Sequence, residues 1–270
     1  MLNCKHSPLP VSQTMTAHQE SIIDQFTRQA IPFSNLYAHT NQESLDLLMK
    51  MASVSDKDTV LDVACGPGIV SCAFAEVASH VTGIDLTPAM IAQAQILAQQ
   101  KNLTNLSWQQ GDIETLPFAD DSFSIVLSRY AFHHFLRPDV VLSEMVRVCR
   151  PGGRILIADV AMPPDKVDTY NYIEKIRDPS HTRALTLEEL PKLVADANLQ
   201  NIKLAFYKVE LELEQQLAAS FPNPGDDNKL RQIFREDIGV DSLGVGAHER
   251  GNEIHYAVPI AVIVGEKAKL

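Results

Sequence analysis

Positive charge is in short supply along this chain of 270 residues, which has 23 lysines and arginines against 34 acidic residues. The resulting net charge of −11 argues against nucleic acid as a partner, because proteins that bind a phosphate backbone normally carry a basic face. Long apolar runs are missing too, since no stretch approaches the roughly 18 apolar residues of a membrane-spanning helix. The first residues, MLNCKHSPLPVSQT, lack the apolar core of a secretory signal. We therefore expect a cytoplasmic protein without a membrane span.

Cysteine is scarce, and the four cysteines present lack the spacing of a metal site. We expect no metal and reduced thiols, as in most cytosolic proteins. One of them, Cys65, interrupts a glycine turn. No base partner for it is evident in the sequence, so we interpret it as a small turn residue and not as a nucleophile. The four are Cys4, Cys65, Cys72 and Cys149.

Strands and helices alternate along the central part of the chain. Apolar stretches bounded by turn residues predict strands, and segments with helical apolar spacing lie between them. This alternation indicates an α/β fold of the Rossmann-like, doubly wound type. We expect a mostly parallel seven-stranded sheet with helices on both faces and a helical lid. The strands are predicted over 59–65, 80–86, 106–112, 122–130 and 154–162, around 202–213, and over 252–267.

Two flanking regions do not follow this alternation of strands and helices. Residues 13–52 are predicted to form two helices, which gives an N-terminal helical cover over residues 1–52. The main domain then spans 53–270, with a lid segment at about 163–198 and an insertion at about 213–250. We interpret the chain as one domain that is covered by helices from both flanks.

The stretch VLDVACGPGIV, residues 60–70, ends the first strand in a glycine turn. Gly66 and Gly68 permit positive φ angles and let a ligand approach the backbone without a Cβ in the way. In open parallel sheets, ligands bind outside the carboxyl ends of the strands. The free N–H groups at the start of the next helix favour an anionic group such as a carboxylate or phosphate. Structural turns also use glycine, so this turn alone is weak evidence of a site.

Acidic residues end the second and third strands as well. Asp85 lies 19 residues beyond Gly66, where a carboxylate can accept hydrogen bonds from both hydroxyls of an adenosine ribose. Asp112 could accept the exocyclic amine of an adenine, with Ile113 against the ring. With Asp62, three successive strands carry an aspartate near their carboxyl ends. The pattern favours an adenosine ligand.

The type of adenosine ligand follows from what the turn lacks. Nicotinamide and flavin sites usually show G-x-G-x-x-G, whereas the third glycine is replaced here by Ser71. The phosphate-loop pattern G-x-x-x-x-G-K-[S/T] is missing too. Asp62 would face a pyrophosphate unfavourably, but it suits a ligand with an ammonium group. S-adenosyl-L-methionine carries an amine, a sulfonium and an adenosine, and it fits this acid-rich pattern.

The sequence resembles the class I S-adenosylmethionine-dependent methyltransferases, in particular the small-molecule type-11 group related to ubiquinone/menaquinone methyltransferases. The segments VLDVACGPG, VTGIDLTPAMIAQAQ, GDIETLPFADDSFSIVLSRYAFHHF and EMVRVCRPGGRILIADV carry the resemblance, roughly over residues 58–162. It implies that the turn holds the methionine part of the cofactor, Asp85 the ribose, and Asp112 with Ile113 the adenine. Met90 would pack near the adenosine, and Arg129 would contact the methionine carboxylate. The implied cofactor-binding residues are Asp62, Ala64, Gly66, Gly68, Asp85, Leu86, Met90, Asp112, Ile113 and Arg129.

The sequence departs from the quinone enzymes after strand four. Those enzymes typically have an Arg-Asn pair there, and this chain has His133 and His134. An imidazole can remove the proton of a hydroxyl or phenol during methyl transfer, so these two are the candidate catalytic residues. The bland alternative is that one of them packs or caps a helix. The Asn/Asp-Pro-Pro-Tyr/Phe run of base-amine methyltransferases is missing, which again disfavours nucleic acid.

Candidate substrate-binding residues come from the two flanks. Tyr37 lies upstream, and Tyr170, His181 and Arg183 follow strand five, where this fold often places a lid. Packing of the lid, or exposure on a loop, explains these residues almost as well.

The leading hypothesis is methyl transfer to a small molecule, with oxygen first among acceptor atoms, carbon second and nitrogen third. An NAD(P)-dependent oxidoreductase and a non-catalytic protein that binds S-adenosyl-L-methionine are the alternatives. The sequence leaves the oligomeric state open, with a homodimer among the options.

Overall fold

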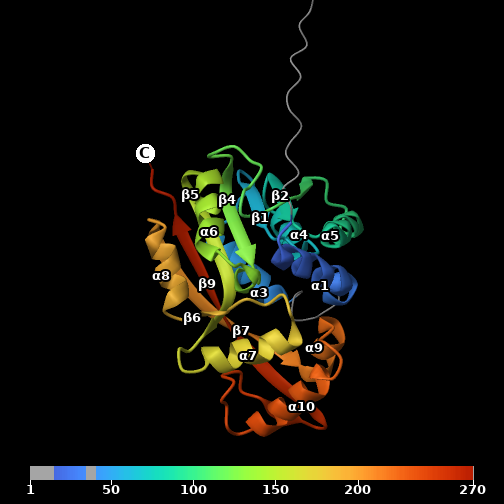
Figure 1. Ribbon diagram of the computed structural model, residues 1–270. Helices are drawn as coiled ribbons and strands as arrows, with labels where there is room; N and C mark the ends of the chain where they lie inside the picture. The colour runs from blue at the N-terminus through green and yellow to red at the C-terminus, as the bar shows by residue number, and fades with distance from the viewer. Residues whose placement is uncertain (1–14, 35–40, 270) are drawn as a thin grey trace, which may run out of the picture.

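The computed structural model describes residues 15–34 and 41–269, and they form a mixed sheet flanked by helices (Figure 1). The main path of the sheet has the order β3-β2-β1-β4-β5-β9-β7. Strands β1 to β5 pair in parallel, whereas β9 runs antiparallel to both β5 and β7. The predicted mostly parallel, doubly wound sheet is confirmed. The strands are Thr59–Val63 (β1), His80–Asp85 (β2), Leu106–Gln110 (β3), Phe123–Arg129 (β4), Cys149–Met162 (β5), Leu185–Thr186 (β6), Gln200–Glu212 (β7), His248–Arg250 (β8) and Glu253–Glu266 (β9).

The main path has the seven strands that the sequence predicts, and in the described residues two short strands, β6 and β8, lie off this path. The two-residue β6 pairs with the end of β5, and β8 forms an antiparallel ladder with the start of β9. Both are short additions to the edge of a longer strand, and neither has the length or alternation that marks a strand in the sequence.

The centre of the sheet explains where a site can form. Strand β1 lies between β2 and β4, with Asp62 opposite Gly83 on one side and Leu127 on the other. The chain reverses its direction of progress across the sheet at this point, and ligands in such folds bind at the carboxyl ends of the strands there. Every residue of β4 is buried, as expected for a parallel strand covered on both faces.

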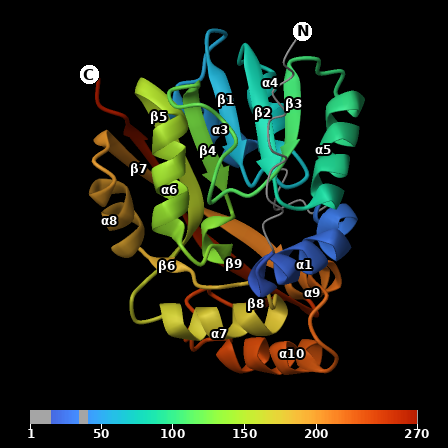
Figure 2. The same ribbon diagram turned by 45° about the horizontal axis from the view of Figure 1, so that its top comes forward.

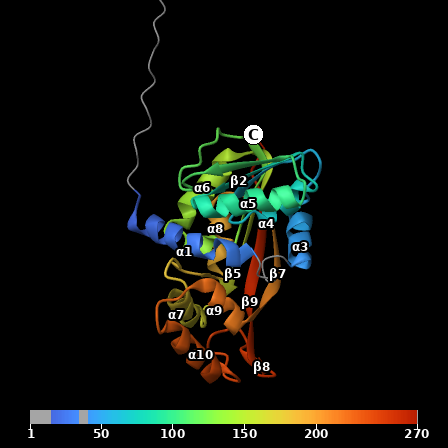
Figure 3. The same cartoon turned by 90° about the vertical axis from the view of Figure 1, so that its right-hand side faces the viewer.

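Helices cover both faces of the sheet (Figure 3). The apolar sides of α3 and α4 pack on one face, and those of α6 and α8 pack on the other. The helix starts follow ordinary capping rules: α3 begins after Asn41, whose side chain accepts from Ser44 N, and α5 has Pro88 in its first turn. The helices are Ala17–Ser34 (α1), Gln42–Ala52 (α3), Ile69–Ala75 (α4), Pro88–Gln100 (α5), Phe132–His134 (the 3₁₀-helix η1), Pro138–Val148 (α6), Val167–Arg177 (α7), Glu189–Asp196 (α8), Leu213–Ser220 (α9) and Asp226–Asp237 (α10).

The two flanks of the chain meet near the carboxyl ends of the parallel strands. Helix α1 lies there, against α5 and α9, while α7 and α10 lie side by side beyond it (Figure 2). The flanks thus contribute an upper wall and a floor around the sheet edge where a ligand is expected. In the described part of the chain, no helix has the length and apolar character needed to cross a membrane.

Some boundaries differ from the sequence prediction. Strand β5 begins at Cys149, which pairs with Phe123, and the ladder then shifts register before Ile125. The Pro-Gly-Gly sequence at 151–153, which was predicted to precede the strand, is therefore an irregularity within it. Helix α10 begins at Asp226, inside the predicted insertion at about 213–250.

Candidate active site

The turn after β1 brings backbone to the carboxyl ends of the strands. Ala64, Gly66 and Gly68 have positive φ angles of 56°, 52° and 78°. A Cβ on Gly66 would meet no atom within 4 Å. A Cβ on Gly68 would lie 2.7 Å from Ala94 Cβ and 2.8 Å from the ring of Trp108. Gly66 therefore leaves space free for a ligand, whereas Gly68 permits close packing of the turn against α5 and β3.

Asp85 ends β2 and is held against this turn by backbone groups. Gly66 N donates to Asp85 Oδ2 at 2.8 Å, and Thr87 N donates to Oδ1 at 2.8 Å. Burial raises the pKa of the Asp85 carboxyl above its usual value, although these two hydrogen bonds act in the opposite direction. The carboxylate thus has a fixed position with lone pairs left for hydroxyl donors.

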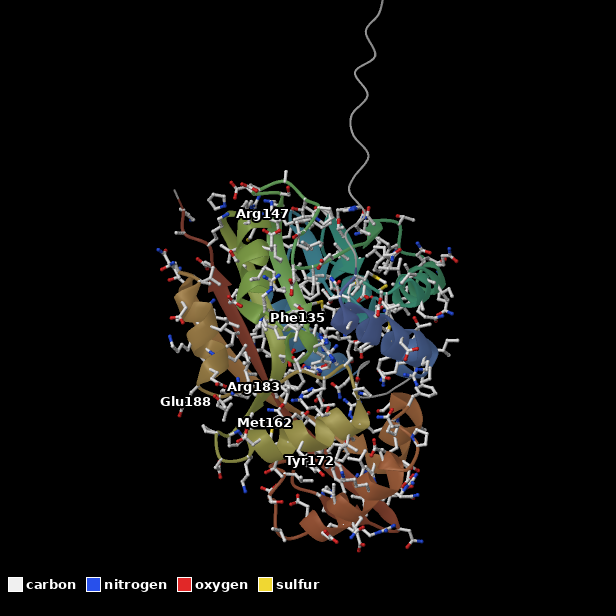
Figure 4. All side chains as sticks on the ribbon, in the orientation of Figure 1. Phe135, Arg147, Met162, Tyr172, Arg183 and Glu188 are labelled. Atoms are coloured by element: carbon white, nitrogen blue, oxygen red, sulfur yellow. The ribbon has the colours of Figure 1, made fainter. Side chains whose placement is uncertain are left out.

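A first cavity opens in front of this turn, with about 1070 Å³ of space free of protein atoms when its open mouth is included. Its lining is mainly apolar, with carboxylates at two strand ends. Phe135 also lines it and lies toward α1 (Figure 4). The predicted residues that line the first cavity are Ala64, Gly66, Asp85, Leu86, Met90, Asp112, Ile113, Arg129 and His134.

Helix α1 closes the first cavity from the side opposite the turn. Gln19 Nε2 donates to Asp112 Oδ2 at 3.0 Å, and His18 Nε2 bonds the backbone oxygen of His134 at 2.8 Å. Ile22 and Phe26, one and two turns further on, add apolar wall. These contacts could not be predicted from the sequence, because they join residues that are far apart in the chain.

Arg129 and Tyr130 follow β4 at the back of the first cavity. Arg129 Nη2 donates to Ser44 Oγ at 3.2 Å and to the hydroxyl of Tyr130 at 3.0 Å. The Tyr130 hydroxyl also bonds that of Tyr207 on β7 at 2.6 Å. Tyr130 has a positive φ angle of 55°, unusual for an aromatic residue. This turn places its ring between the first cavity and a second one.

The second cavity is lined by residues of α1, α7 and α9 and of the antiparallel strands β7 and β9. It shares Phe26, Tyr130 and His134 with the first, so the two cavities meet at these side chains. Tyr170 from α7 and His133 from η1 also line it. A ligand in each cavity would face the other across this junction.

His133 is held by a buried carboxylate. His133 Nδ1 bonds Asp159 Oδ1 at 2.6 Å, while Phe132 N and Val160 N donate to the same carboxylate at 2.8 and 2.7 Å. Asp159 is acceptor in all three bonds, so Nδ1 carries the proton and Nε2 keeps a lone pair. Burial acts to lower the pKa of His133, but the charge and hydrogen bond of Asp159 outweigh it and the pKa is raised. This is the arrangement of an oriented general base.

The other two histidines nearby have different surroundings. His134 Nδ1 bonds the backbone oxygen of Ser180 at 3.1 Å, and burial together with the neighbouring His133 lowers its pKa to about 4. His181 is buried, bonds Asn171 Oδ1 at 2.8 Å through Nε2, and also has a lowered pKa because of burial. Both therefore stay neutral at physiological pH, and no three-residue metal cluster is found among the described residues.

Comparison with known proteins identifies the family. A model of the methyltransferase domain matches residues 54–237. The chain is 34% identical over 234 residues to malonyl-[acyl-carrier protein] O-methyltransferase of Erwinia billingiae, covering 86% of this chain and 84% of that protein. It is 29% identical over 249 residues to the uncharacterized methyltransferase YcgJ of Bacillus subtilis, covering 90% and 97%. The crystal structure of YcgJ matches with a TM-score of 0.78 and 27% identity, over 85% of this chain and 100% of that one. The chain belongs to the class I S-adenosylmethionine-dependent methyltransferases.

This membership confirms the enzyme class and the cofactor, S-adenosyl-L-methionine, that the sequence predicted. It decides against the nicotinamide-dependent oxidoreductase and the non-catalytic binding protein. The methyl acceptor, the acceptor atom and the individual site residues stay predictions.

Two residues predicted to bind the cofactor of this methyltransferase do not line the first cavity. Asp62 is buried behind the turn and accepts a hydrogen bond from Ser71 Oγ at 2.6 Å. Burial, with a contribution from the nearby charge of Asp85, raises its pKa to about 7. Gly68 faces α5, as described above. We therefore do not propose a direct contact between the cofactor and either residue.

The predicted substrate residues of the methyltransferase are spread out. Tyr170 lines the second cavity, and His181 lies behind it with its ring 5.5 Å from that of His133. Arg183 lines neither cavity, because its guanidinium is on the surface in an ion pair with Glu189 at 2.7 Å. Figure 4 places Arg183 on the side of the molecule where α8 lies. Tyr37 lies outside the described residues.

Sequence reasoning missed the partner of His133. Asp159 lies in the apolar run RILIADV, where a carboxylate in a buried strand was a readable signal of the same kind as Asp62. Tyr170 on α7 was among the candidates, but the lining contributed by β7, β9 and α9 was missed, because those elements carry no motif.

Proposed function

We propose that this methyltransferase transfers a methyl group to a hydroxyl oxygen of a small molecule, with His133 as the general base. The first cavity would hold the cofactor and the second would hold the acceptor. The observation that carries the proposal is the pair formed by His133 and Asp159 on the wall of the second cavity, next to the junction with the first. The O-methyltransferase name of the Erwinia billingiae relative agrees with oxygen as the acceptor atom, although a malonyl group offers a carboxylate oxygen and not a hydroxyl.

The first cavity suits S-adenosyl-L-methionine. The open space at Gly66 would admit the methionine part beside the backbone, and the fixed carboxylate of Asp85 would accept from the ribose hydroxyls. Asp112 accepts a hydrogen bond from Gln19 of α1, and it would accept one from the adenine amine after this bond breaks. Arg129 at the back of the cavity would face the carboxylate of the methionine part. When bound, the cofactor supplies a methyl group that is already activated on a sulfonium.

The chain itself has three tasks in this reaction. The junction side chains Phe26, Tyr130 and His134 align the acceptor with the methyl group, and alignment alone supplies much of the rate in such displacements. Asp159 keeps the lone pair of His133 Nε2 available. As the acceptor oxygen bonds to the methyl carbon and the carbon–sulfur bond breaks, the hydroxyl proton passes to that nitrogen.

The two adjacent histidines thus receive different roles. His134, with its pKa lowered to about 4, is a weak base and serves as a neutral wall residue of both cavities. His133 has a raised pKa, and in its neutral form the lone pair of Nε2 would be available to the acceptor. A ring carbon beside a hydroxyl would use the same base, whereas a neutral amine would need none.

The test is methyl transfer by the purified protein to a panel of phenols, hydroxy acids and quinone precursors, with the variants His133→Gln and His134→Gln. We expect His133→Gln to lose about 10²–10⁴ of kcat, the usual contribution of a general base, while cofactor affinity stays unchanged. His134→Gln, the matched control, should lose far less. An undiminished rate in His133→Gln, or methylation of nitrogen alone, would contradict the proposal.

A further inference from the structure

Arg177 carries the one permanent positive charge among the described residues that line the second cavity. Its guanidinium already forms an ion pair with a neighbouring carboxylate and donates to a serine hydroxyl. Nε and Nη2 donate to Glu174, the latter at 2.6 Å, and Nη1 donates to Ser220 Oγ at 2.8 Å. Glu174 is buried and Arg177 nearly so, with side-chain exposures of 9% and 11%. The positive charge of Arg177 is therefore balanced by the carboxylate of Glu174 before any ligand binds.

The remaining charged groups of the second cavity are negative. Asp178 lies next to Arg177, and although burial acts to raise its pKa, the charge of Arg177 and the hydrogen bonds from Ser180 prevail and keep the pKa low. Burial raises the pKa of the phenols of Tyr170 and Tyr256, which therefore stay neutral. With His133 neutral, the described lining bears a net negative charge. A carboxylate or phosphate brought here would lose its hydration without gaining a cation.

The second cavity does offer hydrogen-bond acceptors. Gln216 is 7% exposed and lines the second cavity, and its Oε1 has no hydrogen-bond partner among the described residues. His133 Nε2 is the other acceptor, as its Nδ1 is bound to Asp159. A buried acceptor without a donor costs free energy, so a ligand that brings an O–H group gains from filling it. The other walls are apolar: Val160, Val209, Leu211, Val258 and Ile260.

From these contacts we infer that the methyl acceptor is an uncharged hydroxy compound with an apolar body, such as a phenol or an alcohol, and not a carboxylate or phosphate. The inference rests on the proposed assignment of the second cavity to the acceptor. The ion pair of Glu174 with Arg177 then sets specificity, since it neutralises the one permanent cation that the described residues place in the lining of the second cavity.

Two matched probes test the inference: 2-naphthol and 6-hydroxy-2-naphthoate, which differ by one carboxylate. Their binding is measured by calorimetry at pH 8.5 in the presence of S-adenosyl-L-homocysteine, so that no turnover is needed. We expect 2-naphthol to bind at least tenfold more tightly than the naphthoate. Equal or tighter binding of the naphthoate, or no binding of either probe, would overturn the inference.

The variant Glu174→Gln sharpens the test because it frees the charge of Arg177. We expect the naphthoate to gain about tenfold in affinity and 2-naphthol to change less than twofold. Glu188→Gln removes the same charge from the exposed surface, away from the cavity, and should change neither (Figure 4). Gln216→Leu should weaken 2-naphthol several-fold without involving the ion pair. An unchanged preference in both cavity variants would count against the inference.

The two proposals fail in different ways. If 2-naphthol binds selectively but receives no methyl group on its oxygen when S-adenosyl-L-methionine is added, the proposed O-methyl transfer falls while the inferred charge preference stands. If the naphthoate binds better and is methylated on oxygen through His133, the reverse holds.

Discussion

The two cavities that meet at Tyr130 are built in different ways. The first takes its ligand-facing groups from the ends of β1, β2 and β3 and the turns that follow them. The second takes its walls from α1, α7, α9, β7 and β9, which lie far apart in the sequence. Backbone geometry near one strand end can specify an adenosine pocket through a few residues, whereas a pocket assembled from distant helices leaves no local signature. Binding of the cofactor, which all enzymes of the family share, would take place in the first cavity, and recognition of the particular methyl acceptor would take place in the second.

The largest expected effect separates the two cavities directly. Asp85→Ala removes the carboxylate that faces the first cavity, and with it two charge-assisted hydrogen bonds to a ribose. Each is worth about 1.5–3 kcal/mol, so we expect S-adenosyl-L-methionine to bind at least 100-fold more weakly. Binding of 2-naphthol to the second cavity should be unchanged. Calorimetric titration measures both, and a parallel loss of both affinities would show that the two cavities are not independent.

How far the sequence predicts each region follows from this difference. The common location of Asp85, Gly66 and Asp112 beside one cavity could be predicted, because strand ends converge at one edge of a parallel sheet. Arg183 could not be placed, because nothing local indicates that it pairs with Glu189 on the surface. Glu174 with Arg177 has the spacing of an ordinary exposed helix pair, and only the packing of α7 buries it.

A second prediction concerns the two glycines of the turn. Gly68→Ala forces a Cβ to within 2.7 Å of Ala94 in a left-handed backbone, and overpacking together with that strain should lower the free energy of unfolding by about 2–4 kcal/mol. Gly66→Ala meets no atom, so the φ strain alone should cost about 1 kcal/mol, but its methyl group fills ligand space. We therefore expect Gly66→Ala to lose cofactor affinity and Gly68→Ala to lose stability. Denaturant unfolding and calorimetry together check this, and the opposite pattern would reverse the roles given to the two residues.

A third prediction addresses the second cavity through pH. The pKa of His133 is raised, and the neutral form is the base, so the rate should rise with pH through a value above the ordinary 6.5 or so of histidine. Asp159→Asn removes the charge that raises this pKa and leaves burial to lower it. The rising limb of log kcat against pH should then move to lower pH, and its plateau should fall because Nδ1 is no longer held.

Asp168→Asn on the exposed side of α7 is the matched control for this shift. A profile that moves to higher pH in Asp159→Asn, or one that moves equally in both variants, would contradict the role given to His133. Thermal unfolding of each variant shows whether the fold is retained, which matters because Asp159 also binds two backbone N–H groups.

The smallest expected effect concerns Asp62, which lies behind the wall of the first cavity. With a pKa of about 7 it is roughly half protonated at pH 7, and a cationic ligand nearby favours the carboxylate. Binding of S-adenosyl-L-methionine at pH 7 should therefore release up to about half a proton, as linkage requires. Calorimetry in two buffers of different ionisation enthalpy measures the release. S-adenosyl-L-homocysteine, which lacks the sulfonium charge, should release less, and Asp62→Asn should remove the release that depends on this carboxyl. If Asp62→Asn released as many protons as the unmodified protein, another group near the turn would be losing the proton when the cation binds. Asp62 would then serve the packing of α4 through its hydrogen bond with Ser71 and not the binding of the cofactor.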